Sequence, residues 1–141
     1  MISEKDSHTD QELRKIYDFK KIAVIGMSKN PEKAGHFVPK YLINKGYTII
    51  PVNPNSSEIM GMKSYARVSD VIEPVEIVDV FRKSEDILDV VRDVVQKEGV
   101  KLLWLQEGIH NPSAEELALS KGIDVIYNRC MMAEHMRLFG N

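Results

Sequence analysis

The chain has 141 residues, of which 43% are hydrophobic and 28% charged, and its formal net charge is -2. This length favours one domain with one core, and the charge gives no general reason to bind nucleic acid or an anionic membrane. Because no apolar run approaches the ~18 residues that cross a bilayer, no signal-peptide core is visible, and Cys130 is the only cysteine, we expect a cytoplasmic protein.

Strand and helix patterns alternate along the whole chain. Apolar runs predict five strands, at 22–25, 47–53, 75–81, 100–106 and 123–128. Helical spacing and capping residues predict helices at 10–19, 31–46, 68–72, 84–98 and 112–122, and one from Met131. Pro31 and Glu32 fit the first turn of the second helix, Pro39 should bend it or delay its start, Ser69 should open the helix at 68–72, and Ser84 should cap the next.

This alternation predicts an α/β fold with a parallel sheet and right-handed crossovers. Five strands are too few for an eight-stranded barrel. We therefore expect a single Rossmann-like domain, a doubly wound parallel five-stranded sheet with helices on both faces. Residues 1–141 form this domain, divided into an N-terminal helical arm at 1–19, packed on the outside, and a core at 20–141.

The loop after the first strand has features of a phosphate site. Gly26 permits a sharp turn, and the N-terminus of the next helix offers free N–H groups to an anion. Ser28 stands where a dinucleotide-binding loop has its second glycine, and Lys29 or Lys33 can add positive charge. The alternative is that this loop only caps the following helix and that its lysines are exposed to solvent. The candidate residues are Gly26, Met27, Ser28, Lys29, Asn30 and Lys33.

The end of the second strand argues against a usual NAD site. The run "IIPVNPN" has no carboxylate before Glu58, whereas NAD domains place an acid there for the ribose. Asn53 can hydrogen-bond a ribose or adenine, and Pro54 offers an apolar edge to a purine. An Asn-Pro turn without a ligand is the alternative.

The later loops place further polar residues at the same edge. Arg82 can bind phosphate through two hydrogen bonds, although a solvated charge before a helix is equally compatible with the sequence. The residues that follow strands three to five are Phe81, Arg82, Lys83, Gln106, Glu107, Gly108, His110, Asn128, Arg129 and Cys130.

The assembled motifs resemble the CoA-binding domain family, stand-alone relatives of the N-terminal domain of the succinyl-CoA synthetase alpha subunit. The resemblance covers residues 19–141 and is carried by "VIGMSKNPEKAG", "GYTIIPVNPNSSEIMGMKSY", "VDVFRKSE", "LLWLQEGIHNPSAEELALSKGIDVIYNRC" and "EHMRLFG".

The resemblance implies how coenzyme A would lie. The diphosphate would bind at Gly26, Met27 and Ser28, and the adenosine at Val52, Asn53 and Pro54. Phe81 and Arg82 would line the ligand, and Leu105 to Gly108 would border the pantetheine chain. The synthetase lysine after the counterpart of Pro54 is absent here, where residues 55–57 are Asn-Ser-Ser. The synthetase's second domain, with its phosphohistidine, has no counterpart, so we expect binding without the ligase reaction.

Catalytic groups are few. Cys130 could form a mixed disulfide with the CoA thiol or act as a nucleophile, but buried cysteine often serves only as a small hydrophobe. Glu107 and His110 could act as acid and base, or only flank a helix. His36, His110, Cys130 and His135 lack the spacing of a zinc site, so we expect no metal.

We therefore expect a non-catalytic binding or regulatory module for CoA or acyl-CoA. The alternatives are a CoA-dependent acyl-transfer or thiol-redox enzyme that uses Cys130 and, less favoured, an NAD(P)-binding protein. The expected partner is a small nucleotide ligand, without nucleic acid or membrane. The sequence also leaves open a homodimer or another protein partner, to which Met131, Met132, Met136 and Phe139 could contribute.

Overall fold

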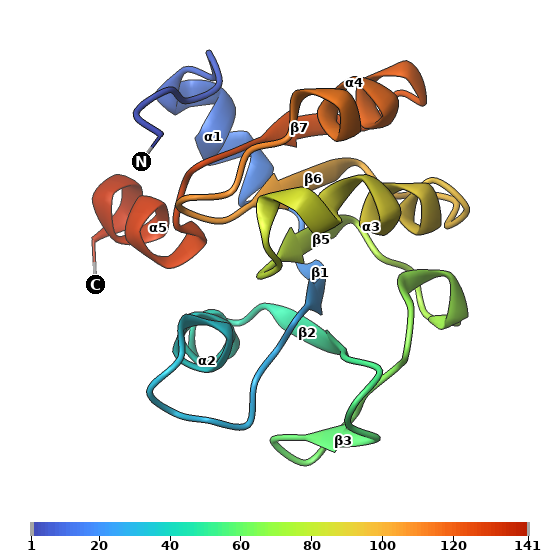
Figure 1. The fold of residues 1–141 in the computed structure, drawn as a ribbon. Helices are drawn as coiled ribbons and strands as arrows, with labels where there is room; N and C mark the ends of the chain where they lie inside the picture. Colours follow the sequence, from blue (N-terminus) through green and yellow to red (C-terminus); the bar gives the residue numbers. More distant parts are fainter. Residues whose placement is uncertain (1, 141) are drawn as a thin grey trace.

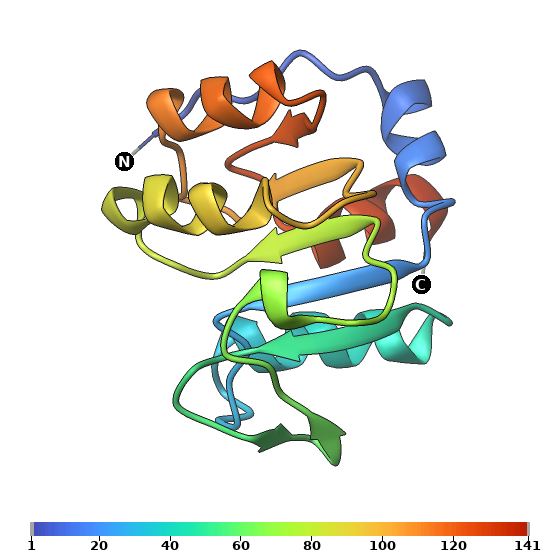
Figure 2. The same ribbon diagram turned by 90° about the vertical axis from the view of Figure 1, so that its right-hand side faces the viewer.

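A computed structural model describes residues 2–140, which form a parallel sheet and a small hairpin (Figures 1 and 2). The sheet strands are β1 (Lys21–Ile25), β2 (Thr48–Val52), β5 (Ile77–Val80), β6 (Leu102–Leu105) and β7 (Asp124–Ile126). The hairpin strands are β3 (Glu58–Ile59) and β4 (Met62–Lys63). The helices are α1 (Asp10–Ile16), α2 (Ala34–Asn44), α3 (Ile87–Val94), α4 (Pro112–Ser120) and α5 (Met131–Phe139), with 3-10 turns η1 (Val68–Asp70) and η2 (Ser84–Asp86).

The five-stranded sheet has the order β2-β1-β5-β6-β7, and every neighbouring pair is parallel. The chain moves outward in one direction from β1 to β2 and in the other from β5 to β7. The strand order therefore reverses between β1 and β5, which is where open α/β sheets bind ligands beyond the carboxyl ends of their strands. The predicted fold class is confirmed.

Helices cover both faces of the sheet because successive side chains of each apolar strand point to opposite sides. Ala23 and Ile25 belong to the apolar core beneath α3 and α4, whereas Ile22 and Val24 belong to the core beneath α1, α2 and α5. Figure 1 shows α2 and α5 on one side of the sheet and α3 and α4 on the other. The interior positions of the strands are mostly apolar because both faces of the sheet are buried, and Asp79 of β5 is the exception.

The N-terminal helix adds to the second of these layers. Thr9 accepts a hydrogen bond from the Glu12 N–H, and the Glu12 carboxylate accepts one from the Thr9 N–H, which forms a capping box. Leu13 and Tyr17 are buried, and the Tyr17 hydroxyl donates to the Met131 carbonyl at 2.7 Å. Helix α1 therefore bonds directly to the start of α5.

The predicted start of the second helix is wrong by one turn. Helix α2 begins at Ala34, and Pro31 and Glu32 lie before it in a turn where the Glu32 N–H donates to the Asn30 side chain. Pro39 lies within α2 and lacks the N–H that would bond the Gly35 carbonyl. The Ser28 N–H donates to that carbonyl instead, at 3.0 Å. The proline is thus accommodated inside the helix, and the loop before the helix satisfies the carbonyl that it leaves free.

Three other local expectations are corrected by tertiary contacts. Ser84 does not cap a helix; its hydroxyl accepts the His110 N–H at 3.1 Å, and α3 begins only at Ile87 and ends at Val94. Ser69 lies inside η1, not at its start, and bonds Asp93 of α3. The turn predicted after β2 contains the β3–β4 hairpin, whose turn is made by Met60 and Gly61 with positive φ.

Candidate functional site

The β1–α2 loop is held against its neighbours by close backbone contacts at two glycines. Gly26 has φ +80°, and a Cβ atom there would lie 2.4 Å from the Phe81 carbonyl oxygen. A Cβ atom at Gly35 would lie 2.8 Å from the Gly26 carbonyl oxygen. Because neither contact leaves room for a side chain, these glycines bring the β1 loop, the β5 loop and the start of α2 together.

Polar side chains fix the rest of this loop. The Asn53 amide donates to the Met27 carbonyl at 2.9 Å, which ties the end of β2 to the end of β1. The Ser28 hydroxyl accepts the Asn30 N–H at 3.0 Å, and the His36 ring bonds the Ser28 carbonyl. The loop is therefore preorganised before any ligand arrives, which lowers the entropic cost of binding.

Three adjoining pockets surround the carboxyl edge of the sheet. The β1–α2 pocket, of about 690 Å³, is lined by Gly26, Met27, Ser28, Lys29, Asn30, Lys33, Ala34, Gly35, Asn53, Ser56 and Phe81. The α3 pocket, of about 370 Å³, is lined by Ile25, Val52, Pro54, Ala66, Arg67, Arg82, Asp86, Asp89, Val90 and Asp93. The α5 pocket, of about 480 Å³, is lined by Ala34, Phe37, Phe81, Arg82, Gln106, Glu107, Ile109, Cys130, Met132 and Ala133.

Three residues each line two of the pockets. Ala34 and Phe81 line both the β1–α2 pocket and the α5 pocket, and Arg82 lines both the α3 pocket and the α5 pocket. Phe81 and Arg82 directly follow β5, beside the reversal of strand order. The arrangement suits a large ligand whose chemically different parts occupy different pockets.

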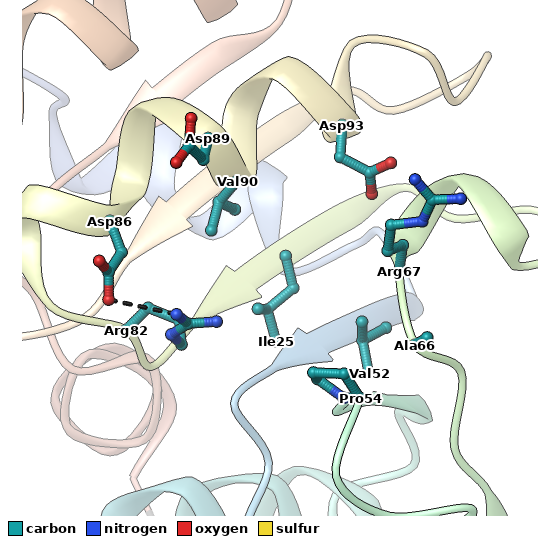
Figure 3. A pocket seen from close by; sticks show the side chains of 10 residues that line it. All are labelled: Ile25, Val52, Pro54, Ala66, Arg67, Arg82, Asp86, Asp89, Val90 and Asp93. Atoms are coloured by element: carbon teal, nitrogen blue, oxygen red, sulfur yellow. Dashed lines mark hydrogen bonds and ion pairs between the residues drawn. The ribbon is translucent and has the colours of Figure 1, made fainter.

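The α3 pocket combines an apolar centre with charged ends. Figure 3 shows Ile25, Val52 and Pro54 between the Arg82–Asp86 pair and the Arg67 and Asp93 side chains. Arg82 and Asp86 form an ion pair at 3.2 Å with both side chains about two-fifths exposed, so this pair is worth little and leaves Arg82 free to turn toward a ligand.

The structure brings most of the predicted site residues into these pockets. The exception is Gly108, whose N–H donates to the Asn128 side chain at 2.7 Å and whose role in the described structure is a turn with φ +85°. The Met27 side chain is fully buried in the core, so only its backbone is available to the β1–α2 pocket. His110 bonds Glu115 and stacks on Tyr127, outside the three pockets.

Some residues that line the pockets could not be assigned to the site from the sequence. Arg67 follows the small hairpin rather than a strand of the sheet, so the rule that sites follow strands did not find it. The sequence indicates only the exposed face of a helix for Asp86, Asp89 and Asp93. Their helical spacing could have indicated a shared face, but not a pocket.

Burial raises the pKa of two groups at or beside the α5 pocket, Asp79 and Cys130. Burial raises the pKa of the fully buried Asp79 to about 7, and the Gln106 amide partly opposes this change. Burial also raises the pKa of the Cys130 thiol, with a smaller contribution from Asp79 and Glu107. A thiol with a raised pKa carries little thiolate at neutral pH and is a poor nucleophile.

Residues 2–140 hold no group of three or more His, Cys, Asp or Glu side chains arranged for a metal ion. Within the same range, no helix has the length and apolar character needed to cross a bilayer.

Comparison with known proteins assigns the family. The CoA binding domain profile matches residues 20–136. The chain belongs to the CoA-binding domain family. Among its relatives, YneT of Bacillus subtilis (strain 168) is 35% identical over 116 residues, which are 82% of this chain and 85% of YneT. A solved structure from Pyrococcus horikoshii OT3 has 36% identity and a TM-score of 0.91, with 99% of this chain and 100% of that chain covered.

CoA-binding domains also occur within larger enzymes. The ADP-forming acetate–CoA ligase of Methanocaldococcus jannaschii is 38% identical over 68 residues, which are 48% of this chain but only 10% of the ligase. This relationship supports the resemblance to the synthetase alpha-subunit family. The rest of the ligase lies outside the matched region.

Proposed function

We propose that this protein binds coenzyme A or an acyl-CoA along the carboxyl edge of its sheet, as a binding or regulatory module without catalysis of its own. The observation that carries the proposal is the junction of three pockets at Phe81 and Arg82. The chemistry of the three pockets suits the adenosine, the diphosphate and the pantetheine of CoA, one group to each pocket. Membership of the CoA-binding domain family supports the same ligand.

The β1–α2 loop fits the diphosphate. Its glycines let the loop pack closely on the β5 loop, and no side chain caps the first turn of α2, whose N–H groups can face an anion. Lys29 and Lys33 line the same pocket and add positive charge. These residues would bind and orient the phosphates, and the Ser28 hydroxyl can donate to one of them.

The α3 pocket fits the adenosine. Pro54 and Val52 offer an apolar surface to the purine, and Asn53 borders the neighbouring pocket. The family's lysine for the ribose phosphate is replaced here by Asn-Ser-Ser at 55–57. We assign that task to Arg82, which lies at one end of the α3 pocket.

The α5 pocket fits the pantetheine end. Phe37, Ile109 and Met132 form apolar walls, and Gln106 offers an amide for hydrogen bonding. Cys130 also lines this pocket, which is the one observation in favour of thiol chemistry. Its raised pKa argues for a packing role.

Titration calorimetry with a ligand series tests the proposal. We expect CoA to bind more tightly than dephospho-CoA, NAD or ATP, because only CoA fills all three pockets and carries the ribose phosphate. Arg82→Ala should weaken CoA binding at least ten-fold and narrow the difference between CoA and dephospho-CoA. Arg14→Ala is the matched control, since Arg14 is exposed on α1 and lines none of the three pockets. Tighter binding of NAD than of CoA would overturn the proposal.

A further inference from the structure

Asp79 is a carboxyl group in the middle of the apolar sheet. It has no solvent exposure, and its neighbours in register are Val24 on β1 and Trp104 on β6. Its Oδ1 atom accepts a hydrogen bond from the Gln106 amide nitrogen. Its Oδ2 atom has no hydrogen-bond partner among residues 2–140. Such a group is costly to bury, so its position calls for an explanation beyond packing.

Gln106 connects this buried carboxyl to the α5 pocket. It directly follows β6, is 4% exposed, and lines the pocket beside Glu107 and Cys130. A primary amide has a donor end and an acceptor end. If one end of the Gln106 amide bonds Asp79, the other end is available to a ligand in the α5 pocket.

We propose that Asp79 is a positioning residue whose proton decides which end of the Gln106 amide faces the α5 pocket, and that this amide binds the carbonyl of an uncharged acyl thioester. With Asp79 neutral, its O–H donates to the Gln106 oxygen, and the NH2 group faces the pocket. With Asp79 ionised, the NH2 group bonds the carboxylate, as in the structure, and the amide oxygen becomes available to the pocket. This inference rests on the proposed CoA binding.

The pocket walls indicate the class of acyl group. Phe37, Ile109, Met132 and Ala133 make the surroundings largely apolar. The Glu107 carboxylate lines the same pocket and repels an acyl group that ends in a carboxylate of its own. A thioester has a carbonyl acceptor but no N–H, so it gains a hydrogen bond from the donor end of Gln106 and none from its oxygen.

Several titratable groups lie on the elements packed around Asp79, and His135 of α5, whose pKa is lowered by burial, contacts Tyr17. Helix α1 presents Tyr17, whose pKa is raised by burial and whose hydroxyl bonds the Met131 carbonyl. Cys130 precedes α5, and its pKa is raised as well. On α5, Glu134 is paired with Arg129 and Arg137 and is held ionised.

The paired strands add no further charge in register, since they present only Val24 and Trp104. Burial raises the Asp79 pKa to about 7, so its proton is exchanged in the range where binding is easily measured. Glu107 is an acid that lines the α5 pocket itself, so it needs its own control.

Calorimetry with acetyl-CoA and S-ethyl-CoA between pH 6 and pH 8.5 tests the inference. The two ligands share every phosphate and differ in the thioester carbonyl, so the ratio of their affinities cancels the titration of the ligand itself. For the wild-type protein we expect acetyl-CoA to bind about three- to ten-fold more tightly at pH 6, the value of one hydrogen bond, and the ratio to approach one at pH 8.5. In Asp79→Asn the ratio should not change with pH.

Two further variants make the test decisive. Gln106→Met keeps the length of the side chain without the amide, and it should abolish the preference for acetyl-CoA at every pH even if Asp79→Asn fails to fold. Glu107→Gln should retain the pH dependence of the ratio. A pH dependence that Glu107→Gln removes, or a wild-type ratio near one at pH 6, would overturn the inference while CoA binding stands. Failure of both ligands to bind would instead overturn the proposed function.

Discussion

The Ser28 N–H donates a 3.0 Å hydrogen bond to the Gly35 carbonyl, the group that loses its helical partner because residue 39 is proline. The proline therefore frees an acceptor inside α2 that anchors the loop after β1. The same Gly35 approaches the Gly26 carbonyl so closely that no side chain would fit. A helix-breaking residue and two glycines thus shape one binding loop, although each alone reads as a local irregularity.

Gly26→Ala should lower the free energy of unfolding far more than the same substitution at Gly99. The new Cβ would meet the Phe81 backbone at 2.4 Å, in addition to the strain of φ +80°. We expect a loss of about 3 kcal/mol or more in the free energy of unfolding. Denaturant unfolding monitored through Trp104, the only tryptophan and fully buried, provides the measurement.

Gly99→Ala is the control for that variant. Gly99 has a similar φ of +87° but no atom within 4 Å of the new Cβ. It should cost about 1–2 kcal/mol, from backbone strain alone. Equal costs for the two variants would contradict the close contact between the β1 and β5 loops.

Asp79→Asn should gain stability relative to the wild type as the pH rises. The folded-state pKa of Asp79, about 7, lies above its ordinary value of 3.8, so the folded state holds its proton more tightly than the unfolded state. Wild-type stability therefore falls from about pH 4 to pH 7, by on the order of 4 kcal/mol from this group. The variant lacks this change. If the free energies of unfolding of the wild type and the variant differ by the same amount from pH 4 to pH 8, Asp79 is not buried as described.

His8→Gln tests the link between the N-terminal segment and β7. The His8 ring bonds Asp124 at 2.7 Å and Asp6 at 2.6 Å. Burial opposes protonation, but these two carboxylates prevail and raise the His8 pKa. Its stabilisation is therefore complete below pH 6.5 and is lost as the pH rises through the folded-state value. The difference in melting temperature between the wild type and the variant should be largest at pH 6. A difference that instead grows toward pH 9 would contradict this prediction.

Cys130→Ser should leave CoA affinity within about two-fold of the wild type. The thiol lines the α5 pocket, but burial raises its pKa and the binding module needs no nucleophile. Alkylation of Cys130 by iodoacetamide should be slow at pH 7, accelerate toward pH 10, and be slowed further by CoA. Ligand-dependent turnover that disappears in Cys130→Ser would support the enzyme alternative.

Local chemistry explains which parts of the structure could be predicted. Asn111 and Pro112 start α4 as expected, because the Asn111 side chain accepts the Ala114 N–H within the same turn. The apolar strands and their order of appearance also sufficed for the fold class. Ser84 was misread because its partner is His110, which is distant in sequence.

The residues of the candidate site also fall into those that the sequence could predict and those that it could not. Residues that directly follow strands, such as Gly26 and Arg82, are brought to the pockets by the topology of the sheet itself. Arg67 was missed because the hairpin places it there, and a two-residue strand leaves almost no periodic signal. The significance of Asp79 was also invisible, since its partner Gln106 lies on the adjacent strand's end and only pairing of β5 with β6 joins them.

A crystal structure of the protein with CoA bound tests the central claim most directly. The account predicts the diphosphate against the backbone of Gly26 to Ser28, the adenine on Pro54, and the pantetheine chain running past Phe81 toward Gln106. CoA bound elsewhere, or a diphosphate away from the β1–α2 loop, would contradict it.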